Sequence, residues 1–233
     1  EEAITVLTDL ASTKMPWQKL IAAGCMTERH RGDVIRSIPN LDGVIGTRRW
    51  MDIMEVVRAT RETQREIPFA HFPYASTVGS DEKDTRRSAV QGGSAYLKIA
   101  DGCHRGCAYC LIPLIKGDLV SRPIEKILED AKDLQDRGVK EIILIAQDIT
   151  SYGHDLKIKD GLTQLLEAIL TAIPHVPWIR LMYTFPGFVT ESLIQIMASE
   201  PQILPYLDMP LQHADANILR AMRRPHSIPR VRR

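Results

Sequence analysis

Three closely spaced cysteines constrain this chain more than any other feature of its sequence. Cys103, Cys107 and Cys110 form a C-x3-C-x2-C pattern in the stretch Lys98-Ile-Ala-Asp-Gly-Cys-His-Arg-Gly-Cys-Ala-Tyr-Cys110. This spacing places three thiolates on one short loop, too close together for a disulfide framework but suited to three corners of a cuboidal iron–sulfur cluster. A four-iron cluster held by three protein sulfurs leaves one iron open. The pattern therefore predicts a site that takes a substrate or cofactor.

A structural zinc site is the alternative interpretation of the same triplet. Zinc prefers four ligands in paired short spacings. Near the triplet the sequence offers no fourth cysteine, and its one histidine, His104, lies inside the loop next to Cys103. The spacing therefore favours an iron–sulfur cluster.

The composition is that of an ordinary soluble globular protein. The 233 residues are 44% hydrophobic and 25% charged, with a formal net charge of +1, which gives no global reason to expect a nucleic-acid or membrane surface. No run of eighteen apolar residues and no charged-then-apolar leader occurs. Because three of the four cysteines fall within eight residues, we expect a metal and a reducing, cytoplasmic location.

Both ends of the chain are unusual. It begins Glu-Glu-Ala-Ile rather than with Met, so we expect a fragment of a longer protein that lacks both ends. From Arg220 to Arg233 there are six arginines and no acidic residue. This segment has two possible interpretations: a solvated helix face at the end of a fragment, or a surface that contacts a polyanion.

The first 58 residues alternate between helical and strand patterns, which predicts a small α/β layer. Thr27 is the expected cap of the second helix. The expected helices cover residues 1–13, 27–35 and 50–58, and the expected strands cover 20–23 and 43–46.

Residues 59–93 differ in character from what precedes and follows them. The segment is polar and contains Pro68, Pro73 and a mixed-charge run over residues 81–87. We interpret it as a linker between two domains.

Residues 94–233 repeat a strand followed by a helix four times. This repeat predicts a partial, open α/β barrel, because a closed eight-unit barrel needs more chain. The strand at 141–146 is nearly all aliphatic, as expected for a parallel strand buried on both faces. The expected strands are 95–100, 141–146, 178–182 and 206–209, and the expected helices are 123–137, 162–173, 190–198 and 215–222.

Polar residues follow each of these strands, where α/β barrels carry their functional groups. The cysteine loop follows the first strand. The other three strands are followed by Gln147, Asp148 and Thr150, by Tyr183, Thr184 and Phe185, and by Gln212 and His213. The sequence therefore predicts one site at this rim.

A C-x3-C-x2-C loop after the first strand of a partial barrel resembles the radical S-adenosylmethionine (SAM) superfamily. The resemblance implies that Cys103, Cys107 and Cys110 hold a [4Fe-4S] cluster whose open iron chelates the amino and carboxylate groups of SAM. Electron transfer then breaks a carbon–sulfur bond and yields a 5′-deoxyadenosyl radical that abstracts hydrogen.

The resemblance also suggests roles for three neighbouring residues. Tyr109 is expected near the adenine, with simple packing as the alternative. Gln147 and Asp148 are expected to contact the methionine end of SAM, with an ordinary loop or helix cap as the alternative.

Flanking sequence resembles the methylthiotransferase branch of that superfamily. The matching stretches are Leu20-Ile-Ala-Ala-Gly-Cys-Met26, Tyr96-Leu-Lys-Ile-Ala-Asp-Gly-Cys103, Ile112-Pro113, Lys116-Gly117 and Ser121-Arg122-Pro123. Members carry an N-terminal α/β domain in which three cysteines hold a second cluster. Cys25 matches the third of these, and the other two would lie before Glu1. Without the resemblance, a lone cysteine after an apolar strand is an inert core thiol.

The expected domains follow from this resemblance. Residues 1–58 are the C-terminal part of the methylthiotransferase N-terminal domain, residues 59–93 are the linker, and residues 94–233 are a truncated radical SAM barrel.

Two substrates compete within the branch. One group thiomethylates an adenosine beside the tRNA anticodon, and the other thiomethylates the β-carbon of an aspartate in the small-subunit ribosomal protein numbered twelve. The stretches 146–155, 206–213 and 222–225 resemble the ribosomal-protein group. The run from Lys116 to Arg122 is less basic than in the tRNA group, which needs phosphate contacts. We therefore expect the protein substrate, with tRNA as the alternative.

The resemblance also implies partners. SAM serves as methyl donor and radical source, an electron-donor protein supplies electrons, the ribosomal protein or the ribosome is the substrate, and no membrane is involved. The cofactors carry the difficult bond changes, so no catalytic side chain is assigned. His213 and the arginine tail either face the substrate or are structural.

A third interpretation of the chain's function is that it is not an enzyme but a non-catalytic iron–sulfur or zinc binding module. It predicts a closed site with four ligands.

Overall fold

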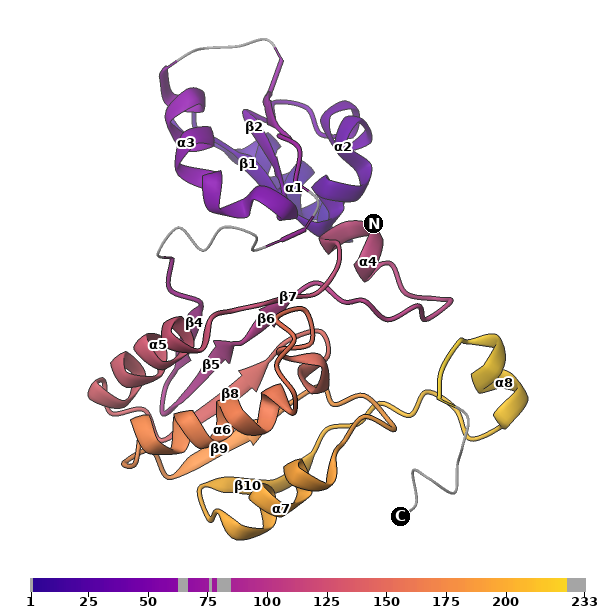
Figure 1. Cartoon of the computed structure of the whole chain (residues 1–233). Coiled ribbons are helices and arrows are strands. Elements are labelled where there is room, and N and C mark those ends of the chain that lie inside the picture. Colours follow the sequence, from indigo (N-terminus) through magenta and orange to yellow (C-terminus); the bar gives the residue numbers. More distant parts are fainter. Residues whose placement is uncertain (1, 63–66, 76, 79–84, 226–233) are drawn as a thin grey trace. The chain divides into compact units, whose positions relative to one another are not determined.

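The computed structural model describes residues 2–62, 67–75, 77–78 and 85–225, which fold into two compact units (Figure 1). The first unit comprises Glu1–Lys83 and Leu114–Gly117, and the second comprises Asp84–Pro113 and Asp118–Arg233. The short helix α4 (Ile112–Lys116) begins in the second unit and ends in the first. Among the described residues, none of the helices combines the length and apolar character needed to cross a bilayer.

The first unit is a three-stranded parallel sheet with helices packed against it. The strands have the order β1-β2-β3, and the core contains Ala11, Ala22, Val34 and Val44. This is the α/β layer that the sequence predicts. The elements are α1 (Glu2–Thr13), β1 (Ile21–Gly24), α2 (Cys25–Ser37), β2 (Gly43–Gly46), η1 (Thr47–Asp52), α3 (Ile53–Glu62) and β3 (Phe69–His71).

Helix α2 starts earlier than its sequence pattern indicates. Its N-cap is Gly24 at φ 128°, a left-handed conformation that favours glycine, and Cys25 is its first residue. Thr27, the expected cap, lies inside the helix and donates a hydrogen bond to the Gly24 carbonyl at 2.8 Å. The prediction of Thr27 as the cap was therefore wrong.

The segment expected to be a linker contributes two strands. Residues 69–71 form β3 at the edge of the first sheet, and β4 (Ser88–Gln91) pairs antiparallel with β5 (Ser94–Lys98) in the second unit. Strands of three or four residues at a sheet edge are too short to produce a clear alternation, so the polar composition hides them.

The second unit contains the four strand–helix repeats that the sequence predicts. Its sheet has the order β10-β9-β8-β5-β4, in which β10, β9, β8 and β5 are parallel to one another and the edge strand β4 is antiparallel to β5. The remaining elements are β6 (Ala100–Asp101), β7 (Val120–Ser121), α5 (Ile124–Asp136), β8 (Glu141–Ile145), η2 (Ile149–Ser151), α6 (Gly161–Ala172), β9 (Trp178–Leu181), α7 (Glu191–Ser199), β10 (Ile203–Leu207) and α8 (Ala216–Ala221).

One face of this sheet forms the core with helices α5, α6 and α7. Ile142 and Leu144 of β8 are completely buried in that core, whereas Ile143 and Ile145 on the other face are only partly buried. The aliphatic run was expected to be buried on both faces. In the described part of the chain, however, the helices cover only the face that carries the fully buried side chains.

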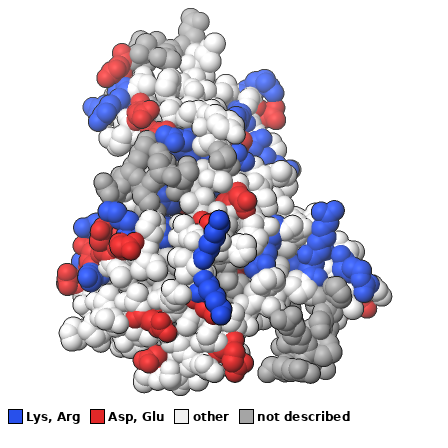
Figure 2. All heavy atoms as spheres, viewed as in Figure 1, with Lys and Arg blue, Asp and Glu red and all other residues white. Residues whose placement is uncertain are grey.

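On the face that Figure 2 shows, acidic and basic side chains are mixed over the second unit. Figure 2 shows blue side chains gathered where Figure 1 draws α8, and Arg220 and Arg223 are both exposed there. In the described part of the basic segment, these two arginine side chains are therefore exposed to solvent.

Candidate functional site

The loops at the carboxyl ends of the strands enclose a cavity of about 410 Å³ in the second unit. This volume is within the range of pockets that hold small ligands. Its walls come from the loops that follow β5, β8 and β9 and from the chain after β10. The lining residues are Cys103, Arg105, Cys107, Tyr109, Cys110, Ile112, Ala146, Gln147, Asp148, Tyr183, Thr184, Phe185, Pro210, Gln212 and Arg224.

The cavity brings together most of the rim residues named from the sequence. The three cysteines, Tyr109, Gln147 and Asp148 all line it. Thr150 lines a neighbouring cavity instead.

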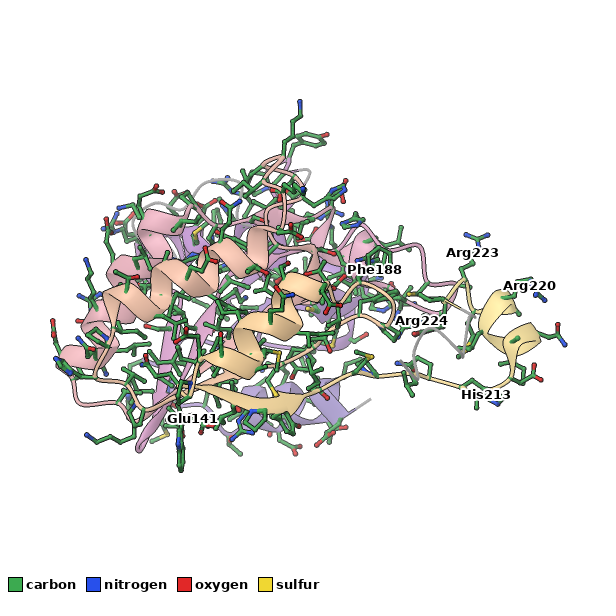
Figure 3. All side chains as sticks on the ribbon, turned by 60° about the horizontal axis from the view of Figure 1, so that its bottom comes forward. Glu141, Phe188, His213, Arg220, Arg223 and Arg224 are labelled. Carbon is green, nitrogen blue, oxygen red and sulfur yellow. The ribbon has the colours of Figure 1, made fainter. Side chains whose placement is uncertain are left out.

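His213 does not line either of these cavities. It is exposed on the segment that leads into α8 (Figure 3), and its Nδ1 accepts a hydrogen bond from the Asp215 amide at 2.9 Å. In this structure His213 shapes the turn before α8.

Each sulfur of Cys103, Cys107 and Cys110 has a nitrogen donor within hydrogen-bond distance. The Arg105 amide donates to Cys103 Sγ at 3.4 Å, and the Ile112 amide donates to Cys110 Sγ at 3.5 Å. Arg224 Nη1 lies 3.7 Å from Cys107 Sγ. Donors to sulfur are among the groups that set the reduction potential of iron–sulfur clusters. The loop thus provides donors of the kind that tune the potential of such a cluster.

The spread of the sulfurs distinguishes a cluster from a single metal ion. Three thiolates on one zinc ion lie about 3.8 Å from one another, from a Zn–S distance of about 2.3 Å in a tetrahedron. Among the described residues, the only three His, Cys, Asp or Glu side chains with ligand atoms all within 4.8 Å of one another are Asp52, Glu55 and His71. As they stand in this structure, the three sulfurs are therefore not gathered as the ligands of one zinc ion would be.

Burial raises the pKa of the Cys103 thiol. A buried thiol remains protonated at neutral pH, so metal binding must release its proton.

Two buried polar atoms of the cavity have no hydrogen-bond partner, which tests whether a ligand fits there. Gln147 Oε1 is an acceptor without a donor, and Arg224 Nε is a donor without an acceptor. Buried polar groups are normally paired, so each of them indicates a partner that the described part of the chain does not supply. SAM carries an ammonium group and a carboxylate, and a cluster carries sulfides. The donor set therefore suits these groups.

Both carboxylate oxygens of Asp148 accept hydrogen bonds from other residues of the chain. Its carboxylate caps η2 through the Thr150 amide at 3.0 Å and accepts from the Ser151 hydroxyl at 2.6 Å. It also accepts from Arg105 Nε at 2.8 Å. The cap interpretation thus describes what Asp148 does in this structure, and Gln147 is the residue with a free acceptor.

Arg105 and Arg224 are site residues that the sequence analysis missed. The Arg105 guanidinium lies 3.7 Å from the Phe188 ring centroid and 4.5 Å from that of Phe185, and Arg224 lies 4.0 Å from the latter. Arg105 lies inside the cysteine loop and Arg224 lies in the basic segment, so both belong to segments that the sequence singles out. Nothing local signals that their side chains turn inward.

A smaller cavity of about 250 Å³ adjoins the first and shares Arg105 with it. His104 and His154 stack there with ring centroids 5.1 Å apart. Burial lowers the pKa of His104, and the nearby Arg105 and His154 lower it further. This environment favours a neutral ring.

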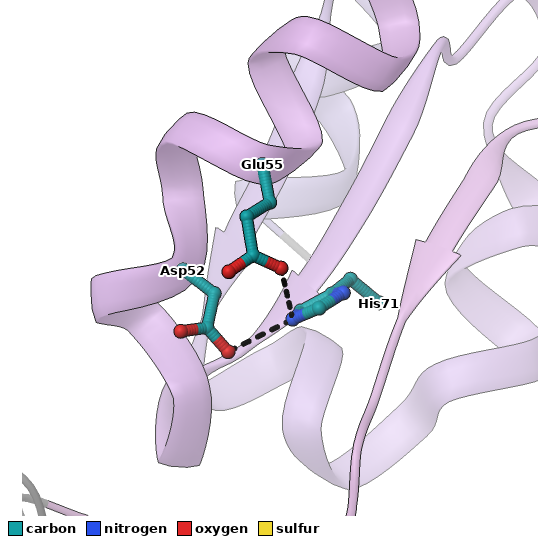
Figure 4. A group of neighbouring side chains, drawn as sticks. All are labelled: Asp52, Glu55 and His71. Atoms are coloured by element: carbon teal, nitrogen blue, oxygen red, sulfur yellow. Dashed lines mark hydrogen bonds and ion pairs between the residues drawn. The ribbon is translucent and has the colours of Figure 1, made fainter.

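The first unit contains an acidic cluster with one histidine (Figure 4). His71 Nε2 lies 2.9 Å from Asp52 Oδ2 and 4.0 Å from Glu55 Oε2. Arg49 already forms two hydrogen bonds with the Asp52 carboxylate, at 2.8 and 3.0 Å. A cation there would compete with Arg49, so the cluster is an ion-pair network.

Cys25 is exposed at the start of α2. It lines a cavity of the first unit together with Ala3, Val6 and Met26. The other three cysteines all belong to the second unit. Cys25 is therefore the one thiol that the first unit can contribute to a metal or cluster.

Comparison with known proteins identifies the family. The radical SAM superfamily model matches residues 97–233. The chain therefore belongs to the radical SAM superfamily, whose members use SAM and a [4Fe-4S] cluster. The expected fold class and superfamily are confirmed.

Similar curated proteins are named ribosomal protein uS12 methylthiotransferase RimO. The chain is 43% identical over 254 residues to the one from Roseiflexus castenholzii, which covers 100% of this chain and 52% of the relative. It is 44% identical over 251 residues to the one from Herpetosiphon aurantiacus, covering 97% and 53% respectively. The chain thus spans about half the length of the curated relatives it matches.

Solved structures with a similar fold include the radical SAM methyltransferase TsrM from Kitasatospora setae. One, with tryptophan substrate and a SAM analogue bound, superposes with a TM-score of 0.64 at 14% identity and covers 96% of this chain and 46% of that one. Another, with cobalamin and a [4Fe-4S] cluster bound, gives a TM-score of 0.55 over 84% and 42%. These similarities show the fold.

Proposed function

We propose that the chain supplies the radical SAM part of a methylthiotransferase that acts on the small-subunit ribosomal protein uS12. The observation that carries the proposal is the cavity in which three thiols of one loop face two unpartnered buried polar atoms. The identity of 43–44% to uS12 methylthiotransferases over 97–100% of this chain supports the substrate.

Cys103, Cys107 and Cys110 are the proposed cluster ligands, which leaves one iron for SAM. When bound, the cluster supplies the electron that cleaves a carbon–sulfur bond of SAM and so starts hydrogen abstraction at the aspartate β-carbon.

The chain's own residues bind and orient the cofactor. We assign Gln147 Oε1 as an acceptor for the SAM ammonium group, because this buried atom of the cavity has no hydrogen-bond partner among the described residues. Tyr109 is 48% exposed and lines the cavity, which suits a ring that packs on adenine. Asp148 acts indirectly, because its carboxylate holds Arg105.

For Cys25 we propose the role of a ligand to a second cluster in the whole protein. It stands at the start of α2, exposed, after the Gly24 cap. The other ligands of that cluster come from outside this chain.

The domain assignment is also part of the proposal. The first unit corresponds to the end of the N-terminal methylthiotransferase domain and the second unit to the barrel. Because β3 belongs to the first sheet and β4 to the second, the proposed linker shrinks to the residues between His71 and Ser88.

The proposed setting is the cytoplasm, with an electron-donor protein as partner. An electron donor is proposed because reduction of the cluster needs an electron that SAM does not provide.

The experiment that tests the substrate is mass spectrometry of uS12 and of tRNA nucleosides from cells that lack the gene. Loss of methylthioaspartate from uS12, restored by the full-length gene, supports the proposal. Full-length protein with Cys107→Ser, which keeps the size of the side chain, is expected not to restore it. Loss of methylthioadenosine from tRNA with intact uS12 would contradict the proposal and favour the tRNA alternative.

A second experiment separates an enzyme from a non-catalytic module. Full-length protein, reconstituted without oxygen and reduced, is expected to convert SAM to 5′-deoxyadenosine, and the Cys107→Ser variant is not. A folded, iron-loaded full-length protein that makes none would leave only the binding-module interpretation.

A further inference from the structure

Arg224 carries a buried guanidinium that has no anionic partner among the described residues. Only 6% of the residue is exposed, and no carboxylate in the described part of the chain forms an ion pair with it. Its Nη2 donates to the Pro210 carbonyl, its Nη1 lies 3.7 Å from Cys107 Sγ, and its Nε has no hydrogen-bond partner. Burying a charge in this way is costly unless an opposite charge compensates it.

The position of Arg224 is set by backbone contacts with the cysteine loop. The Ala108 amide donates to the Met222 carbonyl at 3.0 Å, which joins the residues after α8 to the loop between the second and third cysteines. The Arg224 amide donates to the Leu219 carbonyl at 2.8 Å. The guanidinium also lies over the Phe185 ring. The chain thus fixes this charge beside one sulfur.

Neighbouring arginines of the same segment differ from Arg224. Figure 3 shows Arg220 and Arg223 pointing away from the strand-end loops, whereas Arg224 lies on the side of the loops. Arg220 bonds to Asn217 Oδ1 at 2.8 Å on the exposed face of α8. Arg220 therefore provides a matched control with the same charge and a different location.

A [4Fe-4S] core held by three thiolates has a net negative charge, and one-electron reduction makes it more negative. A fixed positive charge beside a ligand sulfur stabilises the reduced form more than the oxidised form. The positive charge of Arg224 beside Cys107 therefore has the sign that favours reduction of such a cluster.

We propose that Arg224 is the counter-ion of the cluster held by Cys103, Cys107 and Cys110, and that it raises the reduction potential of that cluster. The proposal rests on the cluster assigned to these cysteines above. Arg224 is then a positioning residue that acts on the ease of electron uptake and does not contact the reacting carbon.

The test is a potentiometric titration followed by electron paramagnetic resonance, without SAM, on the chain reconstituted with iron and sulfide. All samples carry Cys25→Ala, so the signal comes from the three-cysteine site. Arg224→Gln keeps a hydrogen-bond donor but loses the charge. We expect it to lower the reduction equilibrium constant about tenfold, which equals a midpoint potential lower by about 59 mV. Arg224→Lys is expected to recover most of the shift, and Arg220→Gln to leave the potential unchanged.

The outcomes separate this proposal from the one it rests on. If the unmodified chain is folded but takes up no iron, the cluster assignment fails. If the cluster assembles and Arg224→Gln has the potential of Arg220→Gln, the role of Arg224 fails alone. An unchanged potential with weaker SAM binding would overturn it in favour of a cofactor-binding role.

Loss of stability does not remove the test, because the resonance signal comes only from molecules that carry the cluster. If Arg224→Gln holds no iron while Arg224→Lys and Arg220→Gln do, the requirement for the positive charge is shown directly.

Discussion

Arg105 Nε lies 2.8 Å from Asp148 Oδ2, in side chains that are 13% and 3% exposed. This ion pair joins the cysteine loop to the loop after β8, across 43 positions of sequence. Arg105 Nη2 also donates a hydrogen bond to the Ser151 hydroxyl at 2.9 Å, so the guanidinium contacts this loop through two nitrogen atoms. The cysteine loop is therefore fastened to the end of the sheet through its own arginine.

Replacing Arg105 by Met should destabilise the chain and loosen the cysteine loop. The change leaves the Asp148 carboxylate buried without its counter-ion, so the free energy of unfolding is expected to fall by about 3 kcal/mol. Urea denaturation of the metal-free chain measures this loss. Arg137→Met is the control, because its ion pair with Asp133 is solvent-exposed, and it should change the free energy by less than about 1 kcal/mol. Equal losses in the two variants would contradict the fastening role.

The same pair predicts coupling between two substitutions. Asp148→Asn removes the charge that Arg105→Met leaves unpaired, so the double variant should lose less than the sum of the single losses, by about 1 kcal/mol or more. Strictly additive losses would show that the two side chains act independently.

Gln147 should matter for the cofactor and not for the fold. Because its buried Oε1 has no partner, Gln147→Leu is expected to leave the free energy of unfolding unchanged or to raise it by up to about 1 kcal/mol. Its loss should weaken SAM binding to the cluster-loaded chain about tenfold, the value of one hydrogen bond. Isothermal calorimetry without oxygen measures the affinity. Gln195→Leu, on the exposed side of α7, is the control, and equal affinities would refute the assignment.

Asp42 makes the stability of the first unit depend on pH. Burial acts to raise the pKa of Asp42, but hydrogen bonds from Lys14, the Leu20 amide and Lys19 outweigh it and hold the pKa below the ordinary value of 3.8. A lowered pKa in the folded state means that the stabilisation is complete above the unfolded pKa and disappears as pH falls through the folded pKa.

Asp42→Asn should therefore cost about 1.5 kcal/mol at neutral pH and progressively less below about pH 4. Urea unfolding followed at several pH values checks the trend. Asp33→Asn is the control, since Asp33 is exposed and its pairing with Arg36 contributes little. A cost that stays constant down to about pH 3 would be inconsistent with the ionised carboxylate as its source.

The sequence predicted the parts of the site that depend on local order. Cys103, Cys107 and Cys110 lie on one loop because of their spacing, and Gln147 lies beside them because parallel strands end at the same rim. These inferences need only the strand–helix repeat, which the hydrophobic pattern of residues 94–225 displays clearly.

The missed features depend on contacts between distant segments. Arg224 meets Cys107 across 117 positions, and no periodicity indicates which arginine of a basic run turns inward. For Asp148 the sequence left a contact with SAM and a helix cap open; it did not indicate the hydrogen bond from Arg105, 43 positions away. The strands β3 and β4 escaped notice because each is short and lies at a sheet edge.

The central claim is that three thiols of one loop hold an iron–sulfur cluster with an open iron. It is tested by iron and sulfide analysis of the Cys25→Ala chain after reconstitution without oxygen, combined with electron paramagnetic resonance before and after SAM is added. The account predicts about four irons and four sulfides for each chain, and a reduced-cluster signal that SAM changes. Folded chain that instead holds a single zinc ion, or a cluster signal indifferent to SAM, would contradict it.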